Sequence, residues 1–340
     1  MAGTVNFDQT DGRTPERTRL ILFWYCASLP FLALNPRQSY PSQEHSKPML
    51  GAIRAVTYSV PDLRAIEDAY VHELGYRVAA RSRISAAQAR SWNAPAIEGF
   101  KVLVLAPASG ETAYLRFIED AEAVGWTALT SYGWNVSEFV VEDVDALARR
   151  LEGGAFQVTG APKPLTRFPM IRAMQAIGPA GECCYFTQVG PGSGLDLAAA
   201  RAFVGRVFIV VAAGPDADAL SVPYTQFGNP VEAPVSTPVT VISRAHHLPL
   251  DTLHRHGLVR LAEGTLIELD EYPPTARARV HRVGKLPPGM AIVTFGVDAL
   301  GELPFLATPI VSKLPGSEGA CACLRGSTGE LIELVAPRRS

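Results

Sequence analysis

The sequence predicts an α+β fold built from two homologous halves, each with two strand–helix–strand units. Three observations predict it. Short segments alternate apolar and polar residues, helical apolar spacing follows several of them, and landmark motifs recur about 150 residues later. At 340 residues, the chain has room for two domains of ordinary size and a remainder.

Composition and charge narrow the class of protein. Hydrophobic residues make up 47% and charged residues 19%, as in a packed globular protein. The net charge of −2 provides no overall positive field, so we expect no nucleic-acid partner. Five cysteines without zinc-site spacing indicate buried small side chains and a reducing, cytoplasmic location.

The first 48 residues differ from the rest. An apolar run at 20–34 follows several arginines, but it is too short for a comfortable membrane span and no clear cleavage site follows. We therefore expect 1–48 to be an extension outside the core, with the folded part beginning near Met49. A targeting segment and an integral packed element are the alternatives.

The predicted elements of the first half begin with an alternating strand at 52–60. Pro61-Asp62-Leu63 then starts a helix through Leu74, which Gly75 ends. A second helix, ending at Leu151, follows Asp143. The remaining strands of this half are predicted at 101–105, 113–118, 138–141, 174–177 and 183–189.

The second half repeats this order. Its strands are predicted at 207–211, 239–243, 265–269, 292–297 and 331–335. Residues 114–117 match 266–269 at an offset of 152, and the turn at 180–182 matches 328–330 at 148. Two tandem modules, 49–192 and 200–340, are therefore expected.

These motifs permit a family comparison. Residues 55–63, the helix end Glu73-Leu74-Gly75-Tyr76, 139–147 and the strand 327–334 together resemble the vicinal oxygen chelate superfamily of glyoxalases, bleomycin-resistance proteins and extradiol dioxygenases. The resemblance covers about residues 50–337. It implies four βαβββ units, paired into two tandem modules whose curved mixed sheets each enclose a pocket.

The resemblance also implies a divalent metal held by His and Glu at one position on each of four strands. The matching residues are Ala55, Arg116, Val136 and Tyr185 in the first module, and Val207 or Arg206, Glu268, Ile292 and Glu333 in the second. Because most of these are not metal ligands, we expect no cofactor. A divalent metal on Glu268 and Glu333 is the alternative.

Strand alternation predicts a polar inward face in the first module. Arg116 would stabilise developing negative charge, while Glu138 or Tyr185 would move protons. The alternative is a structural ion pair between Arg116 and Glu138 that closes a pocket without activity. The residues expected to hold a substrate are Tyr58, Tyr114, Trp134, Asn135 and Arg172.

Five of the seven histidines lie in the second half. His254 and His256 share one face of an extended chain, but no acidic partner stands at a fixed spacing, so surface positions are expected. A contact of His246 or His247 with Glu268 and Glu333 is the alternative.

These residues favour an enzyme: a metal-independent lyase or isomerase acting on a small aromatic or carbonyl compound in the first-module pocket. One alternative is a non-catalytic protein that sequesters a small hydrophobic anion. Another is a metal-dependent glyoxalase- or dioxygenase-type enzyme that uses the second module. The expected partner is a small molecule, without nucleic acid or membrane, and the chain is expected to be a monomer or homodimer.

Overall fold

The computed structural model describes residues 48–165 and 168–337, and every structural statement below refers to them. The predicted extension 1–48 lies outside the described residues except for Pro48. No helix in the described ranges is both long and apolar enough to cross a bilayer.

Four consecutive units of similar build make up this part of the chain. The first contains β1 (Ile53–Val60), α1 (Leu63–His72), β2 (Arg77–Arg83), α2 (Ala86–Ser91), η1 (Pro95–Ile97), β3 (Lys101–Ala106) and β4 (Tyr114–Glu119). The second contains β5 (Gly133–Val141), α3 (Val144–Leu151), β6 (Gln157–Pro164), β7 (Ile171–Ile177) and β8 (Cys183–Val189).

The third and fourth units complete the series. The third contains β9 (Val204–Gly214), α4 (Ala217–Ser221), η2 (Val222–Gln226), β10 (Val231–Pro238), α5 (Thr240–Ala245), β11 (Leu253–Arg260), η3 (Ala262–Gly264) and β12 (Leu266–Glu271). The fourth contains β13 (Gly289–Gly296), β14 (Ile310–Ser312), β15 (Gly319–Arg325) and β16 (Leu331–Ala336), with no helix after its first strand.

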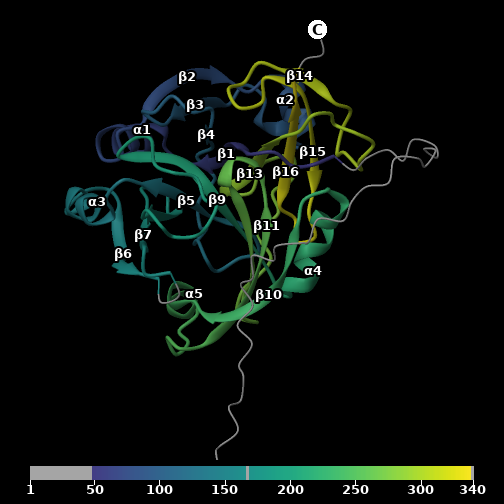
Figure 1. Cartoon of the computed structure of the whole chain (residues 1–340). Helices are drawn as coiled ribbons and strands as arrows, with labels where there is room; N and C mark the ends of the chain where they lie inside the picture. The colour runs from purple at the N-terminus through teal and green to yellow at the C-terminus, as the bar shows by residue number, and fades with distance from the viewer. Residues whose placement is uncertain (1–47, 166–167, 338–340) are drawn as a thin grey trace, which may run out of the picture. The chain divides into compact units, whose positions relative to one another are not determined.

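The strands form two mixed sheets of eight strands each. The first sheet has the order β14-β15-β16-β13-β1-β4-β3-β2, and the second has the order β10-β11-β12-β9-β5-β8-β7-β6. The predicted α+β class, with four units paired into two modules, is confirmed (Figure 1).

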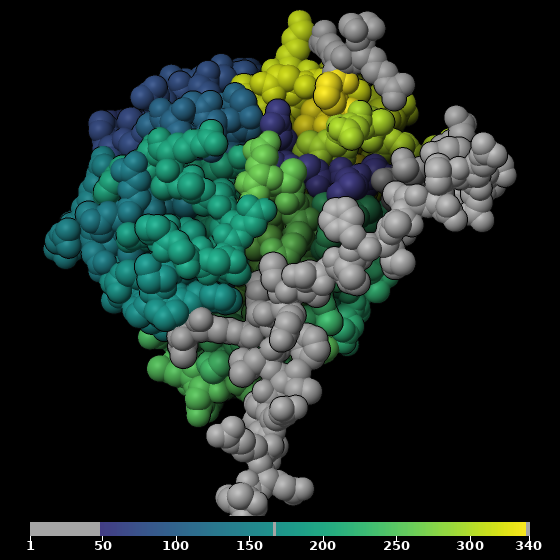
Figure 2. Space-filling model, in the orientation of Figure 1, coloured from purple at the N-terminus to yellow at the C-terminus, as the bar shows by residue number. Residues whose placement is uncertain are grey.

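The pairing of the units differs from the contiguous modules 49–192 and 200–340. In the first sheet β1 pairs with β13, so the first unit joins the fourth. In the second sheet β5 pairs with β9, so the second unit joins the third. Figure 2 shows the purple-blue and yellow parts of the chain together above the teal and green parts.

The physical reason is that the sequence repeat does not encode this choice. An offset of about 150 residues makes the first unit similar to the third and the second similar to the fourth. Either pairing places one odd and one even unit in each sheet. Only the long-range strand contacts select between them.

Local sequence explains where the helices begin. The side chains of Asp62, Asp143 and Asp216 accept hydrogen bonds from the first backbone amides of α1, α3 and α4. The strand predicted at 239–243 is wrong, because these residues lie largely in α5. This short helix buries Val241 and Ile242 against a sheet, so its apolar run reflects packing and not strand alternation.

The largest apolar cluster lies between the two sheets. Tyr58 and Phe117 of the first sheet stack at 5.1 Å between ring centroids, and Phe139 and Phe186 of the second stack at 5.3 Å. Tyr58 also hydrogen-bonds Ser137 across the two sheets at 2.6 Å. Each sheet therefore turns one face toward this shared core. We call the opposite face of each sheet its outer face.

Candidate functional site

The outer face of the first sheet is closed by a buried ion pair. Arg116 on β4 and Glu333 on β16 lie 3.0 Å apart, and both side chains are fully buried. Thr294 and Ser317 each donate a hydrogen bond to Glu333 Oε2, at 2.7 and 2.6 Å. Trp92 Nε1 donates to Glu333 Oε1 at 2.7 Å, and its ring lies 5.5 Å from the Arg116 guanidinium.

The partners of Glu333 keep it charged. Burial alone would raise its pKa, but Arg116 and the hydrogen bonds from Ser317 and Thr294 bring the pKa below its usual value. The segment of α2 and η1 covers the pair with apolar residues such as Ile97. The charges of the pair are therefore balanced internally, although Arg116 Nε has no hydrogen-bond partner within the described residues.

This geometry differs from the predicted role of Arg116. Arg116 pairs with Glu333 and not with Glu138, because the pairing of the units places Glu138 in the other sheet. Tyr114, on the same strand as Arg116, packs against the apolar cover. Glu333 is held by Arg116 and lies in a different sheet from Glu268, so the two do not form a metal pair.

The outer face of the second sheet carries the other predicted polar residues. Glu138 on β5 lies opposite Tyr185 on β8 and opposite Ile209 on β9. Val211 on β9 lies opposite Glu268 on β12. Since alternate residues of a strand share a face, Glu138, Tyr185 and Glu268 form one polar band across the sheet.

Glu138 is a buried carboxylic acid with a raised pKa. Its side chain is buried, and the hydroxyl of Thr187 donates a hydrogen bond to it at 2.5 Å. Burial raises the pKa of Glu138 to about 8, against the Thr187 bond and with a smaller contribution from Glu268. Tyr185 beside it stays protonated, because burial raises its pKa well above the usual value.

Two apolar clusters flank the polar band. On one side, Val136 and Val211 pack with Val241 and Ile242 of α5. On the other, Val140, Ile209 and Leu266 pack near Leu197 and Ala198. The polar band therefore runs between two apolar regions.

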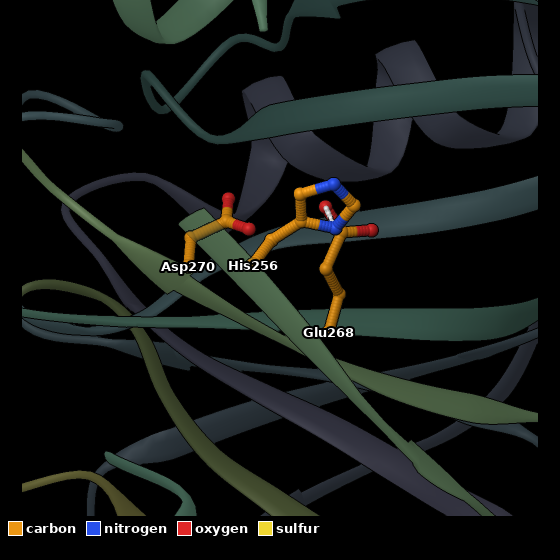
Figure 3. A group of neighbouring side chains, drawn as sticks. All are labelled: His256, Glu268 and Asp270. Atoms are coloured by element: carbon orange, nitrogen blue, oxygen red, sulfur yellow. Dashed lines mark ion pairs between the residues drawn. The ribbon is translucent and has the colours of Figure 1, made fainter. Parts of the chain in front are cut away.

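A cluster that sequence reasoning missed lies at the end of this band. His256 on β11 stands opposite Asp270 on β12, two residues from Glu268. One potential ligand atom from each of the three lies within 4.8 Å of those of the others (Figure 3). The prediction that His256 lacks acidic partners is wrong, because strand pairing supplies them. Counting outward from the turn at 262–264 would have matched residue 256 with residue 270.

Two other histidines of the second half have structural partners. His246 bonds to Thr275 Oγ1 at 2.7 Å and to the carbonyl of Leu129 at 2.9 Å, so it does not reach the glutamates. His254 bonds to Ser243 at 2.9 Å.

The predicted substrate-binding residues are dispersed. Tyr58 and Trp134 lie in the core between the sheets, and Trp134 donates a hydrogen bond to the carbonyl of Leu331 at 2.8 Å. Asn135 is buried and receives the amide hydrogen of Leu129 at 2.9 Å, which fixes a loop. Arg172 forms an ion pair with Asp145 at 2.8 Å. None of these four belongs to the polar band.

The strand positions at which the resemblance implies a metal do not fit one. In the first sheet, Arg116 places a fixed positive charge there, and Glu333 is already neutralised by it. In the second sheet the register places Glu138 opposite Tyr185 and Val211 opposite Glu268, so these four strand positions offer two carboxylates and no histidine. The four-strand ligand set is therefore absent from both described sheets.

Comparison with known proteins addresses the fold. No protein-family model matches the sequence, and no curated protein matches it. Glyoxalase I from Zea mays aligns with a TM-score of 0.56 and 14% identity, covering 84% of this chain and 92% of that one. A putative dioxygenase from Bacillus subtilis aligns with a TM-score of 0.56 and 13% identity, covering 84% of this chain and 85% of that one.

At such identities the likeness concerns architecture. The alignments span both sheets, because they cover more than four fifths of the chain. The resemblance first drawn from local motifs is confirmed at this level. The chain shares its fold, four units in two sheets, with glyoxalase I from Zea mays and with the putative dioxygenase from Bacillus subtilis.

Proposed function

We propose that the protein is a lyase or isomerase that moves a proton on a small aromatic or carbonyl compound bound at the outer face of the second sheet. Glu138 is the proton-transfer group. The observation that carries the proposal is its carboxyl group, which is buried on this face and accepts a hydrogen bond from the Thr187 hydroxyl.

The environment of Glu138 supports this chemistry. A general acid–base catalyst works best when its pKa lies close to the working pH, and burial brings that of Glu138 to about 8. The Thr187 hydroxyl fixes one carboxylate oxygen. The other oxygen is then oriented for a substrate proton, without the cost of rearrangement during the reaction.

Neighbouring groups support a carbonyl substrate. The protonated phenol of Tyr185, directly opposite Glu138, is a donor for the oxygen on which charge develops when a proton leaves the adjacent carbon. The flanking apolar residues, such as Val136 and Ile209, would contact the body of the compound. Arg116, expected to provide positive charge, is replaced in this role by Tyr185.

The test is exchange of carbon-bound hydrogen for solvent deuterium. Acetophenone and phenylpyruvate are incubated with the protein in D₂O, and exchange is followed by proton NMR. We expect Glu138→Gln to lower the exchange rate by about 10²- to 10⁴-fold, the usual contribution of a general base. Glu142→Gln, an exposed carboxylate on the same segment, is the matched control and should leave the rate unchanged.

The sequestration alternative predicts a different result. A binding protein would shift the NMR lines of the compound without any exchange above the rate in buffer, in wild type and variant alike. Exchange that survives in Glu138→Gln would contradict the role given to Glu138.

A further inference from the structure

We propose that His256, Glu268 and Asp270 form a binding site for one divalent first-row transition-metal cation on the outer face of the second sheet. The site stands on the contacts of these three side chains. It is therefore independent of whether Glu138 moves a proton.

The geometry brings three ligand atoms to one point. His256 Nδ1 lies 4.0 Å from Glu268 Oε1, and the carboxylate of Asp270 completes a triangle whose sides are at most 4.8 Å. Figure 3 shows the three side chains rising from two adjacent strands on the same side of the sheet. A cation about 2.1 Å from each atom would draw the ligands together by small side-chain rotations.

Two of these atoms lack partners within the described part of the chain. Asp270 is 3% exposed, and its Oδ1 has no hydrogen-bond partner; nor has His256 Nδ1. A buried carboxylate oxygen without a donor costs about 1–3 kcal/mol or more, so such atoms are rare in proteins. A cation would satisfy both atoms at once.

The repeat provides a comparison within the molecule. In the first sheet, Val102 on β3 lies opposite Ile118 on β4, in the place that His256 and Asp270 take in the second sheet. Val102 and Ile118 are buried in an apolar cluster. The fold therefore does not require polar side chains at these positions, and a ligand explains their presence better than packing does.

The identity of the ligands selects the class of cation. One imidazole with two carboxylates suits Mn²⁺, Fe²⁺, Co²⁺ or Zn²⁺ more than Mg²⁺, which prefers oxygen ligands alone. His256 Nε2 lies 2.9 Å from the hydroxyl of Thr237. This second contact would orient the ring with Nδ1 toward the carboxylates, as outer partners of metal-bound histidines do.

This ligand set is distinct from the one that the fold resemblance implies. Of the three residues, only Glu268 stands at one of the four strand positions considered above. His256 comes from β11, a strand that contributes none of them, and Asp270 is two residues further along β12.

The site is tested by calorimetric titration of metal-free protein with MnCl₂, ZnCl₂ and MgCl₂. We expect one Mn²⁺ or Zn²⁺ per chain and binding of Mg²⁺ about 100-fold weaker. The variants His256→Val and Asp270→Ile introduce the residues found at the matching positions of the first sheet. Each should abolish this binding while retaining the thermal unfolding transition.

Two further variants sharpen the result. Thr237→Val should weaken Mn²⁺ binding by about 10- to 100-fold, the usual effect of removing an outer partner. Glu138→Gln should still bind the metal, which separates this site from the proposed catalytic group. Wild-type protein that binds no Mn²⁺ or Zn²⁺, or an Asp270→Ile variant that binds as well as wild type, would overturn the proposal.

Discussion

The outer faces of the two sheets come from the same repeated strands but have opposite characters. On the first, Arg116 and Glu333 are fully buried and neutralise each other's charge, although Arg116 Nε has no hydrogen-bond partner. On the second, Glu138 and Glu268 have no basic side chain at the equivalent place, and Asp270 keeps an unsatisfied oxygen. The difference shows that polar side chains at equivalent positions of one fold can either bond to each other or remain available for a ligand.

The largest effect should come from opening the closed face. Arg116→Met leaves Glu333 buried without its counter-charge, and should lower the free energy of unfolding by about 3–5 kcal/mol. Urea denaturation followed by circular dichroism measures it. The double variant Arg116→Met with Glu333→Leu removes both charges and should regain most of the loss. A single variant as stable as wild type would show that the pair does not hold this face.

Exchanging matched residues between the two outer faces should change the free energy of unfolding in opposite directions. Ile118→Asp places a carboxylate in an apolar cluster and should destabilise the protein by about 3 kcal/mol. Asp270→Ile removes a buried carboxyl group whose Oδ1 has no hydrogen-bond partner, and should stabilise the metal-free protein by about 1–3 kcal/mol. Both changes are measured by urea denaturation in the presence of a chelator. Equal effects at the two positions would contradict the comparison.

The ionisation of Glu138 should make the stability of the protein depend on pH. Its pKa is raised in the folded state, so its contribution to stability is complete below the unfolded pKa and is lost as the pH rises through about 8. Glu138→Gln lacks this loss. Relative to wild type, the variant should gain on the order of 3 kcal/mol between pH 5 and pH 8.5. Parallel stability profiles in chelator-containing buffers would argue against a raised pKa.

The smallest effect is expected at Arg172. Its ion pair with Asp145 is well exposed on both sides, so Arg172→Ala should change the free energy of unfolding by less than about 1 kcal/mol. Because Arg172 does not belong to the polar band, hydrogen exchange of bound ketones should be unaffected. A large loss of hydrogen exchange in the variant would show that Arg172 takes part in substrate binding, as the sequence predicted.

The sequence predicts which residues lie on the outer faces better than it predicts which units pair to form each sheet. Strand alternation predicted that Arg116, Glu138 and Tyr185 point away from the packed core of their sheets, toward the expected pocket. Each of the three lies on the face that we call the outer face. Alternation misplaced Trp134, because a bulge between Trp134 and Val136 turns the tryptophan into the core. A bulge of this kind leaves no clear mark in the alternation of residues.

The pairing of the units was beyond local patterns. Thr57 on β1 pairs with Ile292 on β13, but the spacing of apolar residues in either segment does not indicate that the two strands are neighbours. Arg116 therefore appeared to belong with Glu138 when its partner is Glu333. The triad at His256 was within reach, because a hairpin turn fixes the register of its two strands.

The nesting of one pair of units inside the other has a consequence for the order in which the protein forms. The strands β5 and β9 are joined by about seventy residues, between Glu138 and its partner Ile209. β1 must wait for β13, more than two hundred residues later. Loop closure favours the nearer partner. During synthesis, the second sheet, which carries His256, Glu268 and Asp270, would therefore be complete while β1 still lacked β13, one of its two neighbours.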